Sequence, residues 1–158
     1  MNNLYKDAEQ KILNFLKTKN LSILQDVVDL LYLLFDKYNW IGIYIVKDNN
    51  LILGPWRGIQ ATEHIKIPIG KGICGSAVKT GKTELINNVN NDNRYLACFT
   101  STKSEIVVPI KRNDNVIGEI DIDSDKKDSF DHNDKEFLEI IANNLKFIDA
   151  IVNYISSK

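Results

Sequence analysis

Residues 105–123 read EIVVPIKRNDNVIGEIDID, and this stretch contains two strand-like runs on either side of a polar turn. In the second run, residues 115–123, the side chains alternate between two faces, because successive residues of a strand point to opposite sides of a sheet. One face takes Val116, Gly118, Ile120 and Ile122, and the other takes Ile117, Glu119, Asp121 and Asp123. The pattern predicts a strand with one apolar face and one largely acidic face.

The first run, residues 105–111, also has strand character, and the Asn-Asp-Asn sequence that follows it is typical of a hairpin turn. An antiparallel hairpin would bring Glu105 close to Asp121 and Asp123, if its register places Glu105 on the acidic face. Asp121 and Asp123 are themselves only about 7 Å apart along the strand. The hairpin is therefore predicted to gather carboxylates at one of its ends.

Carboxylates this close repel one another, and partial burial would raise the pKa of some of them. Solvent, a Lys or Arg side chain, a metal or a cationic ligand must offset that repulsion. In one interpretation the aspartates face water at the end of a strand. In the other they line a pocket for an ammonium group, with Cys98, seven residues before Glu105, beside it.

The composition indicates a soluble globular chain of one domain. It has 158 residues, of which 44% are apolar and 26% charged, and its formal net charge of −1 argues against a nucleic-acid or membrane-surface partner. No apolar run approaches the roughly 20 residues that span a bilayer, and the N-terminus lacks the apolar core of a signal peptide. We therefore predict a cytoplasmic location. The two cysteines, Cys74 and Cys98, have no zinc-type spacing, and a reducing compartment disfavours a permanent disulfide but permits a transient one.

Hydrophobic periodicity gives the remaining elements. Helices are predicted at residues 4–17, 23–37, 72–80 and 133–156, and further strands at residues 39–46, 51–56, 64–67 and 83–86. Ser22 and Gln25 form a predicted capping box for the second helix, Gly81 ends the third, and Asp131 caps the last. This order indicates one α+β domain, residues 1–158, with helices in 1–37, sheet and loops in 39–123 and a helix in 131–156. Its central sheet would be mainly antiparallel and flanked by helices.

The strand at residues 39–46 has two different faces. Ile41, Ile43 and Ile45 would join the helix-covered side, whereas Trp40 and Tyr44 would join the acids on the other side. Aromatic rings beside carboxylates suit a small cation, although ordinary core packing explains the aromatics alone. In the second helix, Leu30 and Leu33 add a second apolar face, which is compatible with a homodimer and equally with burial in a monomer.

Six segments together resemble one known family. They are NWIGIY (39–44), LGPW (53–56), IPIGKGICG (67–75), AC (97–98), SEIVVP (104–109) and GEIDID (118–123). Their order and spacing are similar to those of the free methionine-(R)-sulfoxide reductases, which are single-domain enzymes with the GAF fold. The resemblance runs from about residue 39 to residue 134, and the flanking helices are compatible with it.

The resemblance implies roles for particular residues. Cys98 would attack the sulfur of free methionine sulfoxide, Glu105, Asp121 and Asp123 would line the substrate site, and Trp40 and Tyr44 would help enclose it. The substrate's ammonium group would offset the acids, and a protonated carboxyl could donate to the sulfoxide oxygen. A sulfenic acid on cysteine would follow, to be reduced by thioredoxin or another thiol, with no bound cofactor.

The chain also departs from the family pattern. The family usually has a further cysteine shortly before the IPIG segment, and here residues 58–68 contain none. Either Cys74 resolves the sulfenic acid through a transient disulfide, or an outside thiol resolves it directly. Phe99 stands where the family often has an aspartate, and Glu119 where it usually has an apolar residue. The acids disfavour a thiolate, so a cation such as Lys103, a helix N-terminus or the substrate must compensate.

Two further interpretations remain open at this stage. The chain could be a non-catalytic GAF module that binds a small ligand and signals to a partner. It could also be a thiol-based redox sensor in which oxidation links Cys74 to Cys98.

Overall fold

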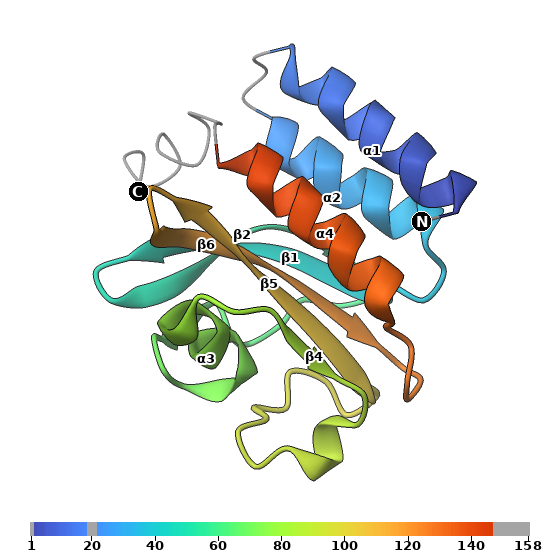
Figure 1. Cartoon of the computed structure of the whole chain (residues 1–158). Coiled ribbons are helices and arrows are strands. Elements are labelled where there is room, and N and C mark those ends of the chain that lie inside the picture. The colour runs from blue at the N-terminus through green and yellow to red at the C-terminus, as the bar shows by residue number, and fades with distance from the viewer. Residues whose placement is uncertain (1, 19–21, 147–158) are drawn as a thin grey trace.

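The computed structural model describes residues 2–18 and 22–146 of the chain. In order, its elements are α1 (Asn3–Leu16), α2 (Ile23–Leu34), β1 (Trp40–Lys47), β2 (Asn50–Gly58), β3 (Lys66–Pro68), α3 (Gly72–Thr80), β4 (Glu84–Ile86), the 3-10 turn η1 (Val89–Asn91), β5 (Ser104–Arg112), β6 (Asn115–Ser124) and α4 (His132–Leu145) (Figure 1). Residues 147–156 of the predicted last helix lie outside the described residues.

Six strands form one sheet in the order β3-β2-β1-β6-β5-β4, and each neighbouring pair is antiparallel. Two-residue turns join β1 to β2 and β5 to β6, and all four of their residues have positive φ: Asp48, Asn49, Asn113 and Asp114. Such turns match the twist of the strands they connect, and Asn and Asp tolerate positive φ better than other residues. The predicted α+β class and antiparallel sheet are confirmed.

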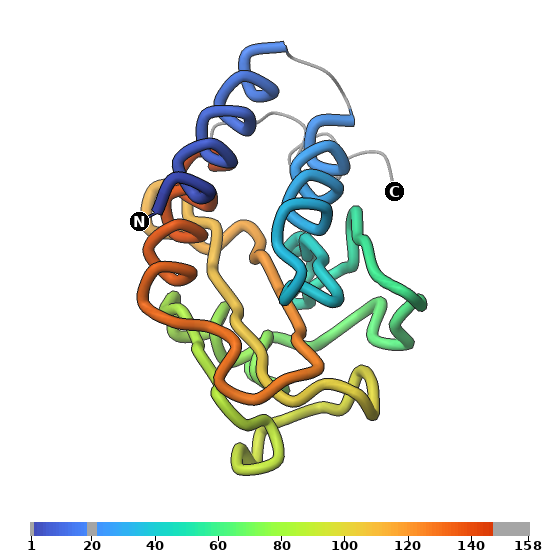
Figure 2. Tube along the Cα trace, turned by 90° about the vertical axis from the view of Figure 1, so that its right-hand side faces the viewer, coloured from blue at the N-terminus to red at the C-terminus, as the bar shows by residue number. Residues whose placement is uncertain are grey.

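One face of the sheet is covered by helices (Figures 1 and 2). α2 packs on β1 and β2, α4 packs on β5 and β6, and α1 lies on α2 and α4 rather than directly on the strands. The sheet contributes alternate residues to this core: Ile41, Ile43, Ile45, Ile106, Val108, Ile110, Ile120 and Ile122. The isoleucines predicted for this side from β1 and β6 therefore all lie in it. Burying these side chains contributes about 2 kcal/mol each.

The start of α2 differs from the prediction. Ser22 makes no side-chain cap, because its hydroxyl donates to the Asp26 carboxylate, while the Gln25 amide donates to Asp29 and to the Trp56 carbonyl. The predicted capping box is therefore wrong. The helix also ends at Leu34, three residues before its predicted end.

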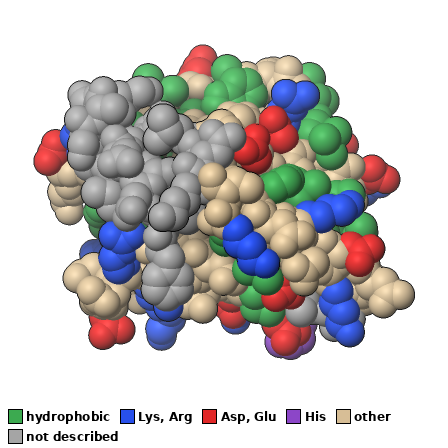
Figure 3. Space-filling view, turned by 90° about the horizontal axis from the view of Figure 1, so that it is seen from above, with side chains coloured by type: hydrophobic (Ala, Val, Ile, Leu, Met, Phe, Trp, Pro, Cys, Tyr) green, Lys and Arg blue, Asp and Glu red, His purple; other side chains and the backbone are tan. Residues whose placement is uncertain are grey.

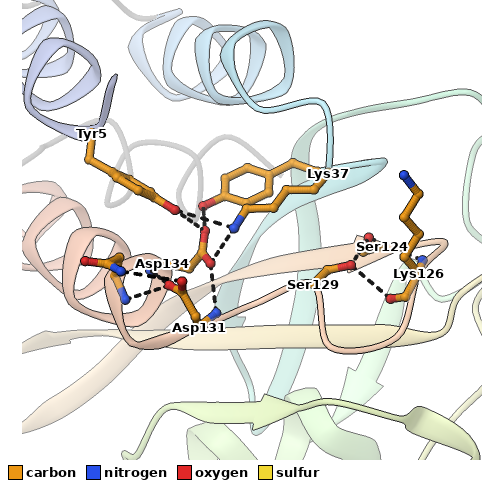
Figure 4. Close-up of polar contacts among 9 residues, drawn as sticks. Tyr5, Lys37, Ser124, Lys126, Ser129, Asp131 and Asp134 are labelled. Carbon is orange, nitrogen blue, oxygen red and sulfur yellow. Dashed lines mark hydrogen bonds and ion pairs between the residues drawn. The ribbon is translucent and has the colours of Figure 1, made fainter. Parts of the chain in front are cut away.

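The predicted cap of α4 is confirmed and belongs to a larger network (Figure 4). The Asp131 side chain accepts hydrogen bonds from the first turn, and the Asp134 carboxylate accepts one from the Asp131 backbone N–H, which makes a capping box. Asp134 also accepts the hydroxyls of Tyr5 at 2.9 Å and Tyr38 at 2.8 Å, and the ammonium of Lys37 at 2.6 Å. One buried carboxylate thus joins α1, the segment after α2, and α4.

Replacing Asp134 with asparagine is expected to lower the free energy of unfolding by about 3 kcal/mol. The change removes the charge that accepts hydrogen bonds from Tyr5, Lys37 and Tyr38 and weakens the capping box, and a hydrogen bond to a charged group contributes roughly 1.5–3 kcal/mol. Urea unfolding at neutral pH measures the effect. Glu136→Gln changes an exposed acid on the same helix and serves as the control, with no measurable change expected. Equal stability of Asp134→Asn and the unmodified chain would contradict the importance of this network.

The helix side of the molecule carries interspersed acidic and basic side chains with apolar groups between them (Figure 3). Leu33 of α2 is one of the exposed apolar residues, at 71% of its full accessibility. Within the described residues, no helix has the length and apolar character needed to cross a membrane.

Candidate active site

The opposite face of the sheet is covered by α3 and by the segments at residues 59–65 and 87–103 (Figure 1). α3 packs on β3, β5 and β6. Its close approach to the preceding turn depends on Gly75, where a Cβ would lie 2.7 Å from the carbonyl oxygen of Pro68 and 2.9 Å from the Gly70 nitrogen. Glycine at this position lets α3 hold the neighbouring Cys74 against the sheet.

Four acids lie on the sheet beneath this cover. Glu105 is directly opposite Asp123 in the β5–β6 ladder, so the register on which the sequence prediction depended is confirmed. The exposed fractions are 4% for Glu105, 0% for Glu119 and Asp121, and 3% for Asp123. The interpretation in which the aspartates face solvent is therefore wrong.

Few neighbouring groups stabilise a negative charge on these carboxyl groups. Among the described residues, no Lys or Arg side chain and no backbone amide donates to their buried oxygens. Burial raises the pKa of Asp121 to about 7. Burial and the charge of Asp121 raise the pKa of Glu105, Glu119 and Asp123 well above the usual range. At neutral pH the cluster therefore holds protons, and it offers O–H donors as well as acceptor oxygens.

Cys74 lies at the centre of this cluster. Its thiol donates to Glu105 Oε1 at 3.7 Å, and its sulfur lies within 4.8 Å of carboxyl oxygens of both Glu105 and Asp121. Burial, followed by the charges of the neighbouring acids, raises the pKa of this thiol well above its usual range. These three residues could supply three of the four ligands of a zinc ion. Protonation accounts for the same arrangement, and we assign no metal to it.

Cys98 lies on the segment between η1 and β5, with its side chain partly buried. Burial raises the pKa of its thiol well above the usual range, and the charges of Asp121, Asp123 and Glu105 add to the effect. Its Sγ lies 3.0 Å from Nδ1 of His64. The sulfur therefore contacts an imidazole on one side and faces acidic groups on the other.

Aromatic side chains form the wall at the Asp123 end of the face. Trp40 stacks on Trp56 with ring centroids 6.2 Å apart, and it also contacts Phe99 at 5.9 Å. A cavity of about 230 Å³ opens there, with Trp40, Phe99 and Asp123 among its lining residues. Tyr44 is fully buried, and its hydroxyl donates to the His64 carbonyl at 2.9 Å.

A second, much smaller cavity lies between the two cysteines. Its volume is about 10 Å³, and Cys74, Cys98, His64 and Glu105 are among the residues that line it. That volume holds at most one water molecule. The larger cavity, by contrast, has room for a molecule the size of an amino acid.

The structure brings all of the sequence-predicted site residues to this one face of the sheet. They are Trp40, Tyr44, Cys74, Cys98, Glu105, Asp121 and Asp123. Sequence reasoning missed His64. One signal could have found it: His64 is one of only two histidines in the chain, and it lies in the segment at 58–68 where the sequence departs from the family pattern.

The fold and this pocket define the chain as a GAF domain. The GAF domain family model matches residues 20–146, which is most of the chain. The free methionine-R-sulfoxide reductase of Escherichia coli is 33% identical over 138 residues, which cover 87% of this chain and 82% of the relative. The free methionine-R-sulfoxide reductase of Saccharomyces cerevisiae is 47% identical over 108 residues, which cover 66% of this chain and 59% of the yeast protein.

A solved structure agrees with these sequence relatives. The free methionine-R-sulfoxide reductase of Neisseria meningitidis, in complex with its substrate, superposes with a TM-score of 0.88 and 27% identity, covering 98% of this chain and 95% of that one. The chain therefore belongs to the GAF domain family and, within it, to the free methionine-R-sulfoxide reductases, a group of oxidoreductases.

Proposed function

We propose that this chain reduces free methionine-(R)-sulfoxide to methionine, with Cys98 as the nucleophile. The observation that carries the proposal is a cysteine set beside three buried acids and an aromatic wall, in a chain of this family. No other described thiol has both partial exposure and a basic neighbour, since Cys74 is buried among acids.

The acids provide the binding site for the substrate's ammonium group. Glu105, Asp121 and Asp123 lack a cationic partner among the described residues, so a bound ammonium would supply the missing charge. Trp40 and Tyr44, which are buried on the same side of the sheet, would enclose the substrate. The space at Cys98 is too small for a substrate, and we therefore expect the segment at residues 95–102 to shift on binding.

In the chemical step, the Cys98 thiolate attacks the sulfoxide sulfur while a protonated carboxyl donates to the sulfoxide oxygen. Asp121, with its pKa raised to about 7, is protonated in part of the population at neutral pH and suits this role. The oxygen then passes to Cys98 as a sulfenic acid, and methionine leaves with two more electrons on its sulfur. The reaction needs no bound cofactor.

Two routes can return the sulfenic acid to a thiol. In the first, Cys74 attacks Cys98 and forms a transient disulfide. In the second, a thioredoxin-like dithiol or another outside thiol attacks directly. Cys74 is buried and its thiol is held protonated, which makes it a poor nucleophile. These features favour the second route.

Two further parts of the proposal concern the cellular location and the oligomeric state of the protein. Cys74 and Cys98 are both free thiols, which fits a reducing cytoplasm. Our proposal also includes a homodimer through the helical side, in which the exposed Leu33 of α2 would lie at the contact.

Turnover of the two epimers tests the proposed function. With dithiothreitol as the reductant, we expect the chain to reduce free methionine-(R)-sulfoxide and to leave the S epimer at least about a hundredfold less reactive, because a chiral pocket presents only one sulfur configuration to Cys98. Methionine release is measured by chromatography. Folded, reduced protein that turns over neither epimer would contradict the proposal and favour a ligand-binding GAF module.

A further inference from the structure

His64 has no part in the chemistry described so far, yet it contacts the reacting sulfur. Its Nδ1 lies 3.0 Å from Sγ of Cys98. Its backbone is fixed on both sides: the N–H donates to Thr62 Oγ1 at 3.1 Å, and the carbonyl accepts the Tyr44 hydroxyl at 2.9 Å. Thr62 and Tyr44 are both buried, so the folded site holds the backbone of His64 in place.

The acids around the sulfur already hold protons to a large extent at neutral pH. Burial raises the pKa of Glu105, Asp121 and Asp123, which project from β5 and β6. Cys74 of α3 is itself held protonated by burial. Among the described residues, His64 is the nitrogen base in hydrogen-bond contact with Sγ.

We propose that His64 is the general base of Cys98 and takes the thiol proton on Nδ1 as the sulfur attacks. With a neutral ring protonated on Nε2, Nδ1 accepts the thiol hydrogen bond and then the proton. This inference rests on the proposed function, because the thiolate it creates is the nucleophile of that reaction.

The proton and electron changes balance over the step. The Cys98 proton moves to His64, and the thiolate forms a bond to the sulfoxide sulfur while a carboxyl protonates the oxygen. The hydroxyl passes to Cys98 as the bond between the two sulfurs breaks, so methionine sulfur gains two electrons and cysteine sulfur loses two. The imidazolium then returns its proton to the carboxylate, and both groups end as they began.

Alkylation of Cys98 tests the pair without requiring turnover. Iodoacetamide is added in excess at neutral pH, and labelling of the Cys98 peptide is followed by mass spectrometry. We expect His64→Asn to slow labelling by at least about tenfold, in line with the loss of a positioned base. His132→Asn changes the exposed histidine that begins α4 and is the matched control, with an unchanged rate expected.

Two further readouts separate a catalytic base from a structural side chain. Added imidazole should restore much of the labelling rate in His64→Gly. His64→Gln keeps a hydrogen-bonding side chain but cannot take a proton, so it should label as slowly as His64→Asn. Equal labelling of His64→Asn and the unmodified chain, failure of imidazole to restore the rate, or fast labelling of His64→Gln would each overturn the role of His64 as a base.

The labelling experiment and the turnover experiment can fail separately. If labelling depends on His64 but neither epimer is turned over, the pair stands and the reductase proposal fails. If the R epimer is turned over and labelling ignores His64, the reductase proposal stands and the pair is wrong.

Discussion

Replacing Cys98 with serine is expected to lower kcat/KM for free methionine-(R)-sulfoxide by at least about a thousandfold. A serine hydroxyl is a far weaker nucleophile than a thiolate and cannot form a sulfenic acid, so the covalent step is lost. Turnover with dithiothreitol measures the effect. Binding of methionine sulfoxide, measured by calorimetry, should persist in the variant, because the acids and the aromatic wall are unchanged.

The Cys74→Ser variant, assayed in the same way, distinguishes the two routes that return the sulfenic acid to a thiol. The outside-thiol route predicts turnover within about threefold of the unmodified chain, because a small dithiol reaches Cys98 without help. A collapse of turnover in Cys74→Ser would instead favour the transient disulfide. Full activity of Cys98→Ser would remove the basis of the proposed mechanism altogether.

The second large effect is expected at Asp121. Asp121→Asn should lower kcat/KM by about a hundredfold, because it removes both a partner of the substrate's ammonium group and a proton donor to the sulfoxide oxygen. The same variant should be more stable than the unmodified chain at neutral pH, by about 1–3 kcal/mol, since it no longer buries an ionisable carboxyl without a cation.

The pH dependence of that stability difference checks the explanation. The folded-state pKa of Asp121 is raised to about 7, so folding favours its protonated form. Below the unfolded-state pKa of about 4, Asp121 is protonated in both states and does not lower the free energy of unfolding. As pH rises from there to about 7, the unfolded state loses this proton more readily than the folded state, and the free energy of unfolding falls. The stability gain of Asp121→Asn should be near zero at the low end of this window, grow across it and then level off. Asp125→Asn, at an exposed acid just beyond β6, is the control and should show no such growth.

The sequence predicted the central part of the site, because the alternation of side chains along a strand depends only on neighbouring residues. Alternation alone placed Asp121 and Asp123 on one face, and the short turn of the hairpin brought Glu105 opposite Asp123. Their burial could not be read this way, since it depends on α3 and on segments that fold over the sheet from elsewhere in the chain. The contact of His64 with Cys98 joins two irregular segments 34 residues apart, and no periodicity describes such segments.

The missed cap of α2 has a similar explanation. Ser22 and Gln25 have the spacing of a capping box, but their side chains found other partners at Asp26, Asp29 and the Trp56 carbonyl. Two of these partners lie on the helix itself, so hydrogen bonds within the first turns of α2 replaced those of the predicted capping box. By contrast, the cap at Asp131 formed because Asp134 is tied in place by Tyr5, Lys37 and Tyr38.

Because β1 and β6 lie at the middle of the sheet, different parts of the site should differ in local stability. The acids of β6 stand on a strand that is hydrogen-bonded on both sides, whereas Cys98 and His64 stand on connecting segments at the surface of the fold. Amide hydrogen exchange should accordingly be slowest in β1 and β6 and faster around residues 59–65 and 95–102. The proposed substrate-binding acids and the proposed nucleophile thus belong to parts of different rigidity, so the loops that carry Cys98 and His64 could be redesigned while the sheet stays intact.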